Sequence, residues 1–381
     1  MTERISVAIV GAGIGGLAAA ALLRQAGIDV RVYEQAPRFA RVGAGIQMAP
    51  NACKVLRRIG AEDRLRAHAL VPESSLNRDY DTGVVTNEFP IAGHVEARYG
   101  APFLCLHRGD LHAALESAVP AEDISLGKKL EALSQDGRGV TLSFADGTQA
   151  SADIVVGADG VHSRVREIIL GPEQPVFTGR IAYRATFPAE RLGEHRIERS
   201  RIKWWGKDRH IVMYYTTEAA DEVYFTTSVP DDGKWATSES WSTKGDLGEL
   251  RAAFAEFHPQ VRAVLDACPE VYKWALLARD PLPRWTEGRV ALLGDACHPM
   301  PPYMAQGASA ALEDAAILAR CVVEATPSTA AAALRRYADT RLPRTSKLQL
   351  SAKANNWMRN DTNPDWVYGY DAWTEPLAAV R

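Results

Sequence analysis

The sequence is poor in the features that mark several large classes of protein. It has only five cysteines, at positions 53, 105, 268, 297 and 321, and their spacing matches no metal-binding motif. It has no run of 18 apolar residues, which argues against a membrane-spanning helix. The net charge of −3 gives no reason to expect nucleic acid or an anionic membrane as a partner. We therefore expect a chain that binds no metal and no membrane and acts on a small molecule.

The remaining bulk properties are ordinary. A chain of 381 residues with 46% hydrophobic side chains can bury a large core, and it suggests two closely integrated domains. An apolar strand is expected within the first ten residues, which leaves no room for a signal peptide. Scattered, odd-numbered cysteines suit a reducing compartment, so we expect a cytoplasmic protein.

The N-terminal segment carries the clearest motif. A predicted strand over 7–10 leads into Gly11-Ala12-Gly13-Ile14-Gly15-Gly16, a predicted helix over 17–26 follows, and a second strand ends at Glu34. In such a motif Gly11 permits the tight turn, Gly13 lets the backbone approach a pyrophosphate, and Gly16 lets helix and strand pack closely. The pyrophosphate then lies at the positive end of the helix. The segment predicts a dinucleotide site, with Glu34 on a ribose, and leaves NAD and FAD as alternatives.

Two later predicted strands also end on an acid beside glycine, at Asp159-Gly160 and at Gly294-Asp295. Open α/β sheets bind ligands at the carboxyl ends of their strands. Asp295 could hold the ribitol hydroxyls of a flavin. A predicted helix over 308–323 could direct its N-terminal dipole, from Gly307, at the pyrimidine end of the flavin.

Two further segments are weaker candidates for ligand contact. Residues 41–51 are predicted to form a loop that passes close to a ligand, with Asn51 capping a helix over 51–59. Arg108 lies at a strand-to-helix junction, before a predicted helix over 111–119 capped by Asp110. Arg108 could pair with a phosphate, and the alternative is a solvated arginine.

Residues 176–285 differ in amino-acid composition from the rest of the chain. Runs of β-branched and aromatic residues, such as 210–217 and 222–228, predict an antiparallel sheet inserted into the nucleotide-binding fold. Its aromatic side chains suit a pocket for a planar ligand, although core packing is the alternative. A helix over 247–257 and a linker should follow. The tail is predicted to be helical from Ala333 and to pack its aromatic run, 366–370, against the body.

Three segments taken together resemble one enzyme family. Residues 11–16, Ala158-Asp159-Gly160 and Gly294-Asp295-Ala296-Cys297-His298-Pro299 are similar, in order and spacing, to the single-component flavoprotein aromatic hydroxylases, the group of the para-hydroxybenzoate and salicylate hydroxylases. The resemblance implies a Rossmann-like FAD-binding domain (1–175 and 286–381, with the helical tail) and a substrate-binding β-sheet domain (176–285). It also implies bound FAD, transient NADH or NADPH, O₂, an aromatic carboxylate substrate and a monomer or weak homo-oligomer. The residues expected to bind FAD are Gly11, Gly13, Gly15, Gly16, Glu34, Gln35, Gln47, Arg108, Leu130, Asp159, Asp295, Gly307 and Ala308.

Within this family the chain most resembles the branch that acts on 6-hydroxynicotinate. The segments Lys203-Trp204-Trp205, 208–210, 214–217 and 304–307 carry that resemblance, together with the tail at 366–370. It implies that His210 and Tyr214, which are four apart and so face one side of a strand, hold the ring hydroxyl and pass its proton. The full set of expected catalytic residues is His210, Tyr214, Gln47 and, in reserve, Tyr215.

Three positions depart from the pattern of that branch. Gln47 and Tyr303 replace histidines, and Arg201 replaces a cysteine. The substrate-binding residues expected here are Arg201, Tyr303 and Pro301. Arg201 could form a fork with a carboxylate, and the alternative is a solvated arginine at a strand end.

The resemblance implies FAD-dependent hydroxylation through a flavin C4a-hydroperoxide, with loss of the carboxylate. The expected substrate is 6-hydroxynicotinate or an isomer such as 5-hydroxypicolinate, and either would give 2,5-dihydroxypyridine. Two alternatives stay open. One is a salicylate or hydroxybenzoate hydroxylase, and the other is a protein that binds FAD without catalysis.

Overall fold

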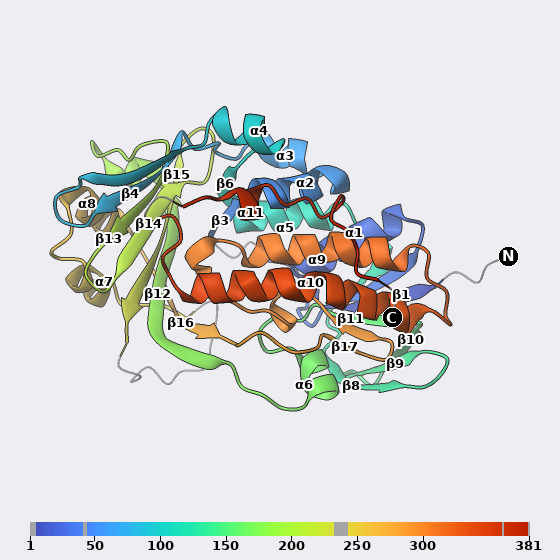
Figure 1. Cartoon of the computed structure of the whole chain (residues 1–381). Helices are drawn as coiled ribbons and strands as arrows, with labels where there is room; N and C mark the ends of the chain where they lie inside the picture. The colour runs from blue at the N-terminus through green and yellow to red at the C-terminus, as the bar shows by residue number, and fades with distance from the viewer. Residues whose placement is uncertain (1–4, 41–43, 232–242, 360–361, 380–381) are drawn as a thin grey trace.

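The computed structural model describes residues 5–40, 44–231, 243–359 and 362–379. Its two main sheets lie side by side in Figure 1, with long helices packed beside the parallel sheet. One sheet has six strands in the order β17-β18-β11-β1-β2-β7, and the other has seven in the order β16-β12-β15-β14-β13-β4-β5. The expected class, an α/β nucleotide-binding fold with a second β-rich part, is confirmed.

The six-stranded sheet is built on the apolar strands of the sequence motifs. β1 (Ser6–Val10) pairs in parallel with β2 (Asp29–Tyr33) and with β11 (Ile154–Gly157). β18 (Val290–Leu292) adds in parallel to β11. Parallel pairing requires crossover connections, which here carry helices that bury the sheet. The arrangement brings the carboxyl ends of β1, β11 and β18 to one edge.

Three helices position the ligand-facing loops of this part. α1 (Ile14–Gln25) follows β1 directly, and α9 (Gly307–Val322) packs against it. α10 (Ala330–Lys353) runs alongside α9, as Figure 1 shows. The predicted helix over 308–323 is therefore confirmed to within one residue at each end. The remaining elements of this part are α2 (Pro50–Ile59), α3 (Glu62–Arg66), α4 (His94–Tyr99), α5 (Arg108–Glu116), α6 (Arg164–Leu170), α11 (Asp365–Tyr368), β3 (Gly45–Met48), β6 (Leu104–His107), β7 (Ile124–Ser125), β8 (Leu130–Gln135), β9 (Val140–Phe144), β10 (Gln149–Ala152), β17 (Thr286–Glu287) and the short 3₁₀ helices Ala121–Asp123, Gly294–Ala296 and Pro302–Met304.

The seven-stranded sheet contains the three predicted antiparallel strands, which are β13, β14 and β15, and four more. Its strands are β12 (Val176–Pro188), β13 (Arg201–Trp205), β14 (His210–Tyr215), β15 (Glu222–Pro230), β16 (Tyr272–Ala278), β4 (Ser74–Asp79) and β5 (Val85–Pro90). β13 pairs in parallel with β4, and β4 pairs with β5. The sheet therefore extends beyond residues 176–285 and includes strands that the predicted division assigned to the FAD-binding part.

Helices cover one face of this sheet. α7 (Leu247–Ala253) and α8 (Pro259–Ala267) bury Phe254 and Val261 in one cluster with Trp204 of β13. The predicted helix over 247–257 is thus shorter than expected. The predicted linker is wrong, because it contains α8 and β16. A 3₁₀ helix, Ala189–Leu192, follows β12.

Several local predictions are corrected by contacts that are distant in the sequence. Residues 45–48 form β3 rather than a loop, because they pair with β6. α2 begins at Pro50, and the buried Asn51 is not its cap but donates through Nδ2 to Gln306 and Glu313. α5 begins at Arg108 and is capped by His107, whose Nδ1 accepts from the Gly109 N–H, so Asp110 is not the cap.

The C-terminal prediction is confirmed in outline. The helix of the tail begins three residues earlier than expected, and Val367 and Tyr368 are buried against the body. Across the described residues, no helix combines the length and apolar character needed to cross a bilayer.

Candidate active site

A cavity of about 350 Å³ lies between the two main sheets, and it collects residues from distant parts of the chain. The N-terminal ends of α1 and α9 line it on one side, and β13, β14 and β15 line it on the other. The lining residues on the side of the parallel sheet are Gly13, Ile14, Gly15, Ala44, Gly45, Ile46, Gln47, Arg108, Ala158, Gly160, Leu293, Gly294, Asp295, Met300, Pro302, Tyr303, Ala305, Gly307, Ala308 and Ala311. Those from the seven-stranded sheet are Arg184, Arg201, Lys203, His210, Val212, Tyr214, Tyr224, Thr226, Thr227 and Trp274.

The turn before α1 has the shape that a pyrophosphate requires. Gly11 has φ +103°, and a Cβ there would lie 2.4 Å from the Ala158 carbonyl oxygen. A Cβ on Gly16 would lie 2.0 Å from the Gly11 carbonyl oxygen. A Cβ on Gly13, in contrast, would meet nothing within 4 Å. The first turn of α1 has no acidic residue and no side-chain cap, so its N–H groups are available to an anion. These residues fit the pyrophosphate of FAD.

Glu34 supports this turn directly. Its Oε2 accepts from the Ala12 N–H at 2.8 Å, and its Oε1 accepts from the Ala36 N–H at 2.8 Å. A carboxylate oxygen can accept more than one hydrogen bond, so these contacts leave capacity for a ribose hydroxyl. Glu34 therefore fixes the turn whether or not it also binds a ribose.

The start of α9 offers a second site for partial negative charge. Gly307 and Ala308 line the cavity, and the first turn contains no acid and no side-chain cap. Asp295 lies nearby and is exposed to the cavity in the flavin-free protein, although the protein around it still raises its pKa against the opposing charges of His298 and Arg108. The loop before Asp295 is fixed by Asp314 of α9, whose Oδ2 accepts from the Gly294 N–H at 3.1 Å.

The structure brings together only some of the residues predicted to bind FAD. Those that line the cavity are Gly13, Gly15, Gln47, Arg108, Asp295, Gly307 and Ala308. Those that do not line it are Gly11, Gly16, Glu34, Gln35, Leu130 and Asp159. The Asp159 carboxylate instead accepts from Ser163 Oγ at 2.5 Å and from the Val165 N–H at 3.0 Å, at the start of α6. Burial raises the pKa of Asp159.

The strand pleat separates the predicted catalytic residues. His210, Val212 and Tyr214 alternate along β14 and face the cavity, as expected for even spacing. Tyr215 faces the other side, where its hydroxyl accepts from the Ile197 N–H at 3.4 Å. The assignment of Tyr215 as a reserve catalytic residue is therefore wrong, because it lies on the far face of the sheet.

Both cavity-facing groups have shifted pKa values. Burial, followed by the nearby charges of Lys203, Arg180 and Arg201, lowers the pKa of His210 well below its usual value. Burial also raises the pKa of Tyr214, whose hydroxyl is hydrogen-bonded to the side chain of Gln47. At neutral pH His210 is an uncharged imidazole and Tyr214 is a protonated phenol.

Among the described residues, four basic side chains and one acidic side chain line the cavity. Arg108 and Arg184 come from distant elements, and β13 supplies Arg201 and Lys203, which are 7% and 1% exposed. Arg201 is thus not a solvated arginine, and its Nη1 donates to Ser75 Oγ at 3.2 Å. Burial lowers the pKa of Arg184 to about 10, and its guanidinium lies over Trp274 at 4.2 Å from the ring centroid. The excess of positive charge favours an anionic ligand.

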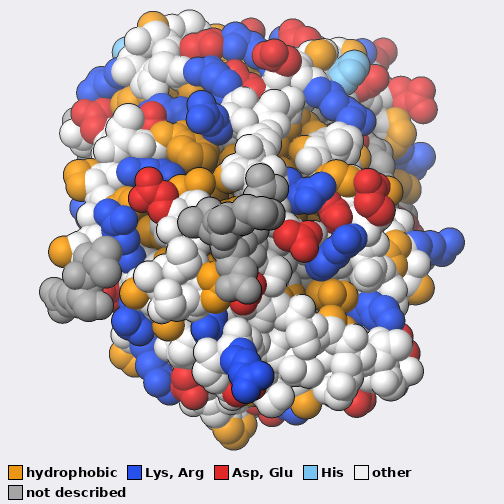
Figure 2. Space-filling view, turned by 90° about the vertical axis from the view of Figure 1, so that its right-hand side faces the viewer, with side chains coloured by type: hydrophobic (Ala, Val, Ile, Leu, Met, Phe, Trp, Pro, Cys, Tyr) orange, Lys and Arg blue, Asp and Glu red, His pale blue; other side chains and the backbone are white. Residues whose placement is uncertain are grey.

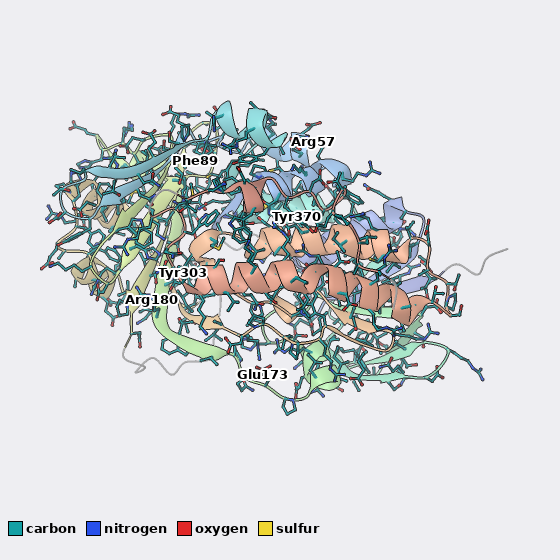
Figure 3. The ribbon with its side chains drawn as sticks, viewed as in Figure 1. Arg57, Phe89, Glu173, Arg180, Tyr303 and Tyr370 are labelled. Carbon is teal, nitrogen blue, oxygen red and sulfur yellow. The ribbon has the colours of Figure 1, made fainter. Side chains whose placement is uncertain are left out.

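Tyr303 is held at the edge of the cavity by a chain of hydrogen bonds. Its hydroxyl lies 3.0 Å from Ser228 Oγ, which accepts from Arg180 Nε at 2.6 Å. Figure 3 shows Tyr303 and Arg180 close together where the sheet meets the ends of α9 and α10. The Tyr303 ring meets the His210 imidazole edge to face, with centroids 5.5 Å apart. Pro301 is buried but does not line the cavity, whereas Met300 and Pro302 do.

A possible metal cluster lies behind the cavity and is explained by an ion-pair network. Cys297, His298 and Asp314 each place one ligand atom within 4.8 Å of the others. The Asp314 carboxylate already accepts from His298 Nε2 at 2.5 Å and from Arg341 Nε at 2.7 Å. A buried arginine therefore provides the positive charge there. The absence of a metal cofactor stays a prediction.

The sequence analysis missed four charged or aromatic residues among those that line the cavity. Tyr224 and Lys203 lie on strands that were predicted, and alternation from Arg201 would have placed Lys203 on the same face. Arg184 lies on β12 and Trp274 on β16. These two strands were not predicted, and they join the sheet only in the folded chain. No local signal marks those two residues.

Comparisons with known proteins agree with this geometry. Residues 4–351 match the family described as FAD binding domain. The 6-hydroxynicotinate 3-monooxygenase of Bordetella bronchiseptica is 46% identical over 100% of this chain and 99% of its own length. The enzyme of the same name from Pseudomonas fluorescens is also 46% identical, with the same coverage.

Solved structures show the same architecture. Klebsiella pneumoniae HpxO complexed with FAD and uric acid has a TM-score of 0.83 and 29% identity, covering 93% of this chain and 88% of that one. A salicylate hydroxylase substrate complex has a TM-score of 0.84 and 25% identity, covering 99% of both chains.

Proposed function

This chain belongs to the FAD binding domain family and is a flavin-dependent aromatic monooxygenase, and on that premise we propose that it hydroxylates a hydroxypyridine carboxylate with loss of CO₂. The substrate is 6-hydroxynicotinate or an isomer such as 5-hydroxypicolinate. The acid, O₂, NAD(P)H and one proton give 2,5-dihydroxypyridine, CO₂, water and NAD(P)⁺. A new C–O bond forms at the carbon that loses the carboxyl group, and the electron pair of the broken C–C bond restores the aromatic ring.

The arrangement of the cavity supports this proposal. The residues that hold FAD are the turn at Gly13, the start of α9 at Gly307, and Asp295. When bound and reduced, FAD supplies the electrons that activate O₂ as an electrophilic oxygen donor. The chain's own contribution is to bind the aromatic acid, exclude water and control its proton.

One juxtaposition carries the assignment of roles. Arg201 and His210 face the same buried cavity, so an anion-binding fork and a proton acceptor are present together. Arg201 binds the carboxylate, since a guanidinium matches its two oxygens. His210 passes the proton of the ring hydroxyl on to solvent, because its uncharged imidazole has a free lone pair at neutral pH and its lowered pKa makes it release the proton readily. Loss of that proton makes the ring carbon para to the oxygen nucleophilic.

Tyr214 and Gln47 complete the other end of the cavity floor. Four residues of extended strand place the Cα atoms of His210 and Tyr214 about 13 Å apart. We therefore assign His210 alone to the hydroxyl. Tyr214, which follows the last registered pair of β13 and β14 (Ile202 with Met213) and so lies near Arg201, orients the carboxylate with Gln47.

A substrate panel tests the proposed function. NADH and NADPH consumption would be measured with 6-hydroxynicotinate, 5-hydroxypicolinate, salicylate, 3-hydroxybenzoate and 4-hydroxybenzoate, with products identified by mass spectrometry. We expect consumption coupled to 2,5-dihydroxypyridine and CO₂ with one of the two pyridines, and NADH as the better donor. Activity with the carbocyclic acids alone would show that the substrate is a hydroxybenzoate and not a hydroxypyridine carboxylate. A flavin-loaded protein that oxygenates no member of the panel would favour a non-catalytic role.

We further propose a cytoplasmic enzyme that is a monomer or a weak homo-oligomer. All five cysteines are buried thiols without a disulfide, as a reducing compartment allows. On the face shown in Figure 2, acidic and basic side chains alternate with small apolar patches among the described residues, as expected for a monomer or a weak oligomer. Light scattering over a range of concentrations, and fractionation of expressing cells, would test these two points.

A further inference from the structure

Lys203 is a buried basic side chain that the proposed mechanism has not yet used. It is 1% exposed and lines the cavity. Within the described part of the chain it forms no ion pair, and burial, followed by the charges of Arg201, Arg359 and Arg180, lowers its pKa well below its usual value. A buried ammonium surrounded by cations is costly unless an anion joins it. The position therefore calls for a negative charge from a ligand.

The register of the sheet shows where that charge should lie. Arg201 and Lys203 are two apart on β13 and so face the same side, with Cα atoms about 6.5 Å apart. Lys203 pairs with Val212, and Arg201 and Tyr214 lie just beyond the last registered pair, Ile202 with Met213. The Lys203 ammonium leans along the strand to 3.6 Å from the centroid of the Trp205 ring.

This lean brings the ammonium to the His210 end of the cavity floor. Trp205 pairs with His210 in the register, and their ring centroids lie 5.2 Å apart. The floor therefore has a guanidinium at one end and an ammonium with an imidazole at the other. The Cα atoms that carry the two basic groups are about 6.5 Å apart, which is close to the span between para substituents on a six-membered ring, and the flexible Lys203 side chain adjusts the separation of the charged ends.

We propose that Lys203 binds the ionised ring hydroxyl of the substrate while Arg201 binds its carboxylate, so that the site selects aromatic acids whose two anionic groups are para. This inference rests on the proposed function. The hydroxyl O–H bond breaks, its electron pair stays on oxygen beside Lys203, and the proton passes through His210 to the buffer. An ammonium suits a single oxygen, and a guanidinium suits the two oxygens of a carboxylate.

The groups that face Lys203 favour this division. Arg201 on its own strand, Arg180 from β12 and Arg359 from the tail are all cations, and His210 from β14 is uncharged. None of these groups can neutralise the ammonium. A dianionic substrate brings two negative charges to Arg201 and Lys203, and a monoanion leaves one cation unpaired.

The test compares three ligands that differ by one group each. The holoenzyme, without a nicotinamide donor, would be titrated with 6-hydroxynicotinate, with nicotinate, which lacks the hydroxyl, and with 2-hydroxypyridine, which lacks the carboxylate. The change in flavin absorbance gives the dissociation constants. Two corresponding sets, from 5-hydroxypicolinate and from 4-hydroxybenzoate, would be run in the same way, and the set whose parent binds best is used.

The two variants should give opposite patterns. Lys203→Met should weaken binding of the parent acid and of the ligand without carboxylate by about 10- to 100-fold. Binding of the ligand without hydroxyl should stay unchanged. Arg201→Met should weaken binding of the two ligands that carry a carboxylate and leave binding of the ligand without a carboxylate unchanged. Lys203→Arg should retain most of the affinity lost in Lys203→Met. Flavin content and thermal unfolding would show that each variant is folded.

A spectroscopic measurement adds a result that a purely structural role would not give. At pH 7 the ultraviolet difference spectrum of the bound parent acid should be that of the oxyanion in the wild type and of the neutral hydroxyl form in Lys203→Met. Equal weakening of all three ligands, or no weakening, would overturn the assignment of Lys203. Failure of the proposed function looks different, since the pattern would then hold with the 4-hydroxybenzoate set and no pyridine would be hydroxylated.

Discussion

Arg341 of α10 and Asp314 of α9 form a fully buried ion pair, with Nε 2.7 Å from Oδ1. Arg341 also contacts Glu313 at 2.9 Å, and Arg344 contacts the same carboxylate at 2.7 Å. Through its other oxygen Asp314 holds the Gly294 N–H. The pair thus connects the packing of two long helices to the loop that carries Asp295.

Removing Arg341 should destabilise the folded protein. Arg341→Met leaves two buried carboxylates short of positive charge, and we expect a loss of about 3–5 kcal/mol in the free energy of unfolding. Urea denaturation of wild type and variant measures it. Lys353→Met, which breaks the exposed pair of Lys353 with Asp280, is the control and should change stability little. Equal effects of the two substitutions would contradict the role given to the buried network.

The charge of Asp295 should destabilise the flavin-free protein. The surrounding protein raises its folded pKa above the unfolded value, so the folded state holds the proton more tightly, but solvent reaches the side chain in the flavin-free protein and keeps this effect small. Its contribution to stability is therefore complete below about pH 4 and is lost as the pH rises through the folded pKa. Asp295→Asn should raise the melting temperature at pH 7 but not at pH 4, and it should weaken FAD binding. A higher melting temperature at both pH values would show that charge is not the cause.

Two glycines of the first turn should respond differently to alanine. Gly11→Ala places a methyl group 2.4 Å from a carbonyl at positive φ, and strain of this kind costs at least about 2 kcal/mol. Gly13→Ala meets no protein atom, so the flavin-free protein should keep its stability. Its methyl group would instead occupy the place of the pyrophosphate and lower FAD affinity. Thermal unfolding and flavin titration of both variants separate the two effects.

The two faces of β14 should differ in their effect on turnover. His210→Ala should lower kcat by about 10²-fold or more, because it removes the proton acceptor of the ring hydroxyl. Tyr215→Phe, on the opposite face, should leave kcat within about twofold of wild type. Steady-state kinetics with the best substrate of the panel gives both values, and an unchanged kcat in His210→Ala would exclude the assigned role.

The part of the site that local chemistry determines could be predicted from the sequence. The turn at Gly11 and the helix from Gly307 depend on neighbouring residues, and both are found where expected. The even spacing of His210 and Tyr214 predicted their common face. The same argument, applied to Tyr215, would have excluded it, because the odd spacing places it on the other side.

The remaining features depend on contacts that no local pattern encodes. Residues 45–48 contain two polar or small residues and form a strand only because β6 lies beside them. Asn51 has the chemistry of a helix cap, but its amide is used to bind Glu313 of α9. Arginine and lysine are usually exposed, so the burial of Arg184, Arg201 and Lys203 in one cavity could be recognised only in the folded chain.

The parallel pairing of β13 with β4 has a consequence for engineering. Exchange of residues 176–285 between relatives would separate β13 from the strand that satisfies its outer backbone groups and would leave Arg201 without Ser75. A chimaera with altered substrate choice must therefore carry residues 74–90 along with the transplanted segment. The seven-stranded sheet that lines the substrate side of the cavity is therefore discontinuous in the sequence and continuous only in the folded protein.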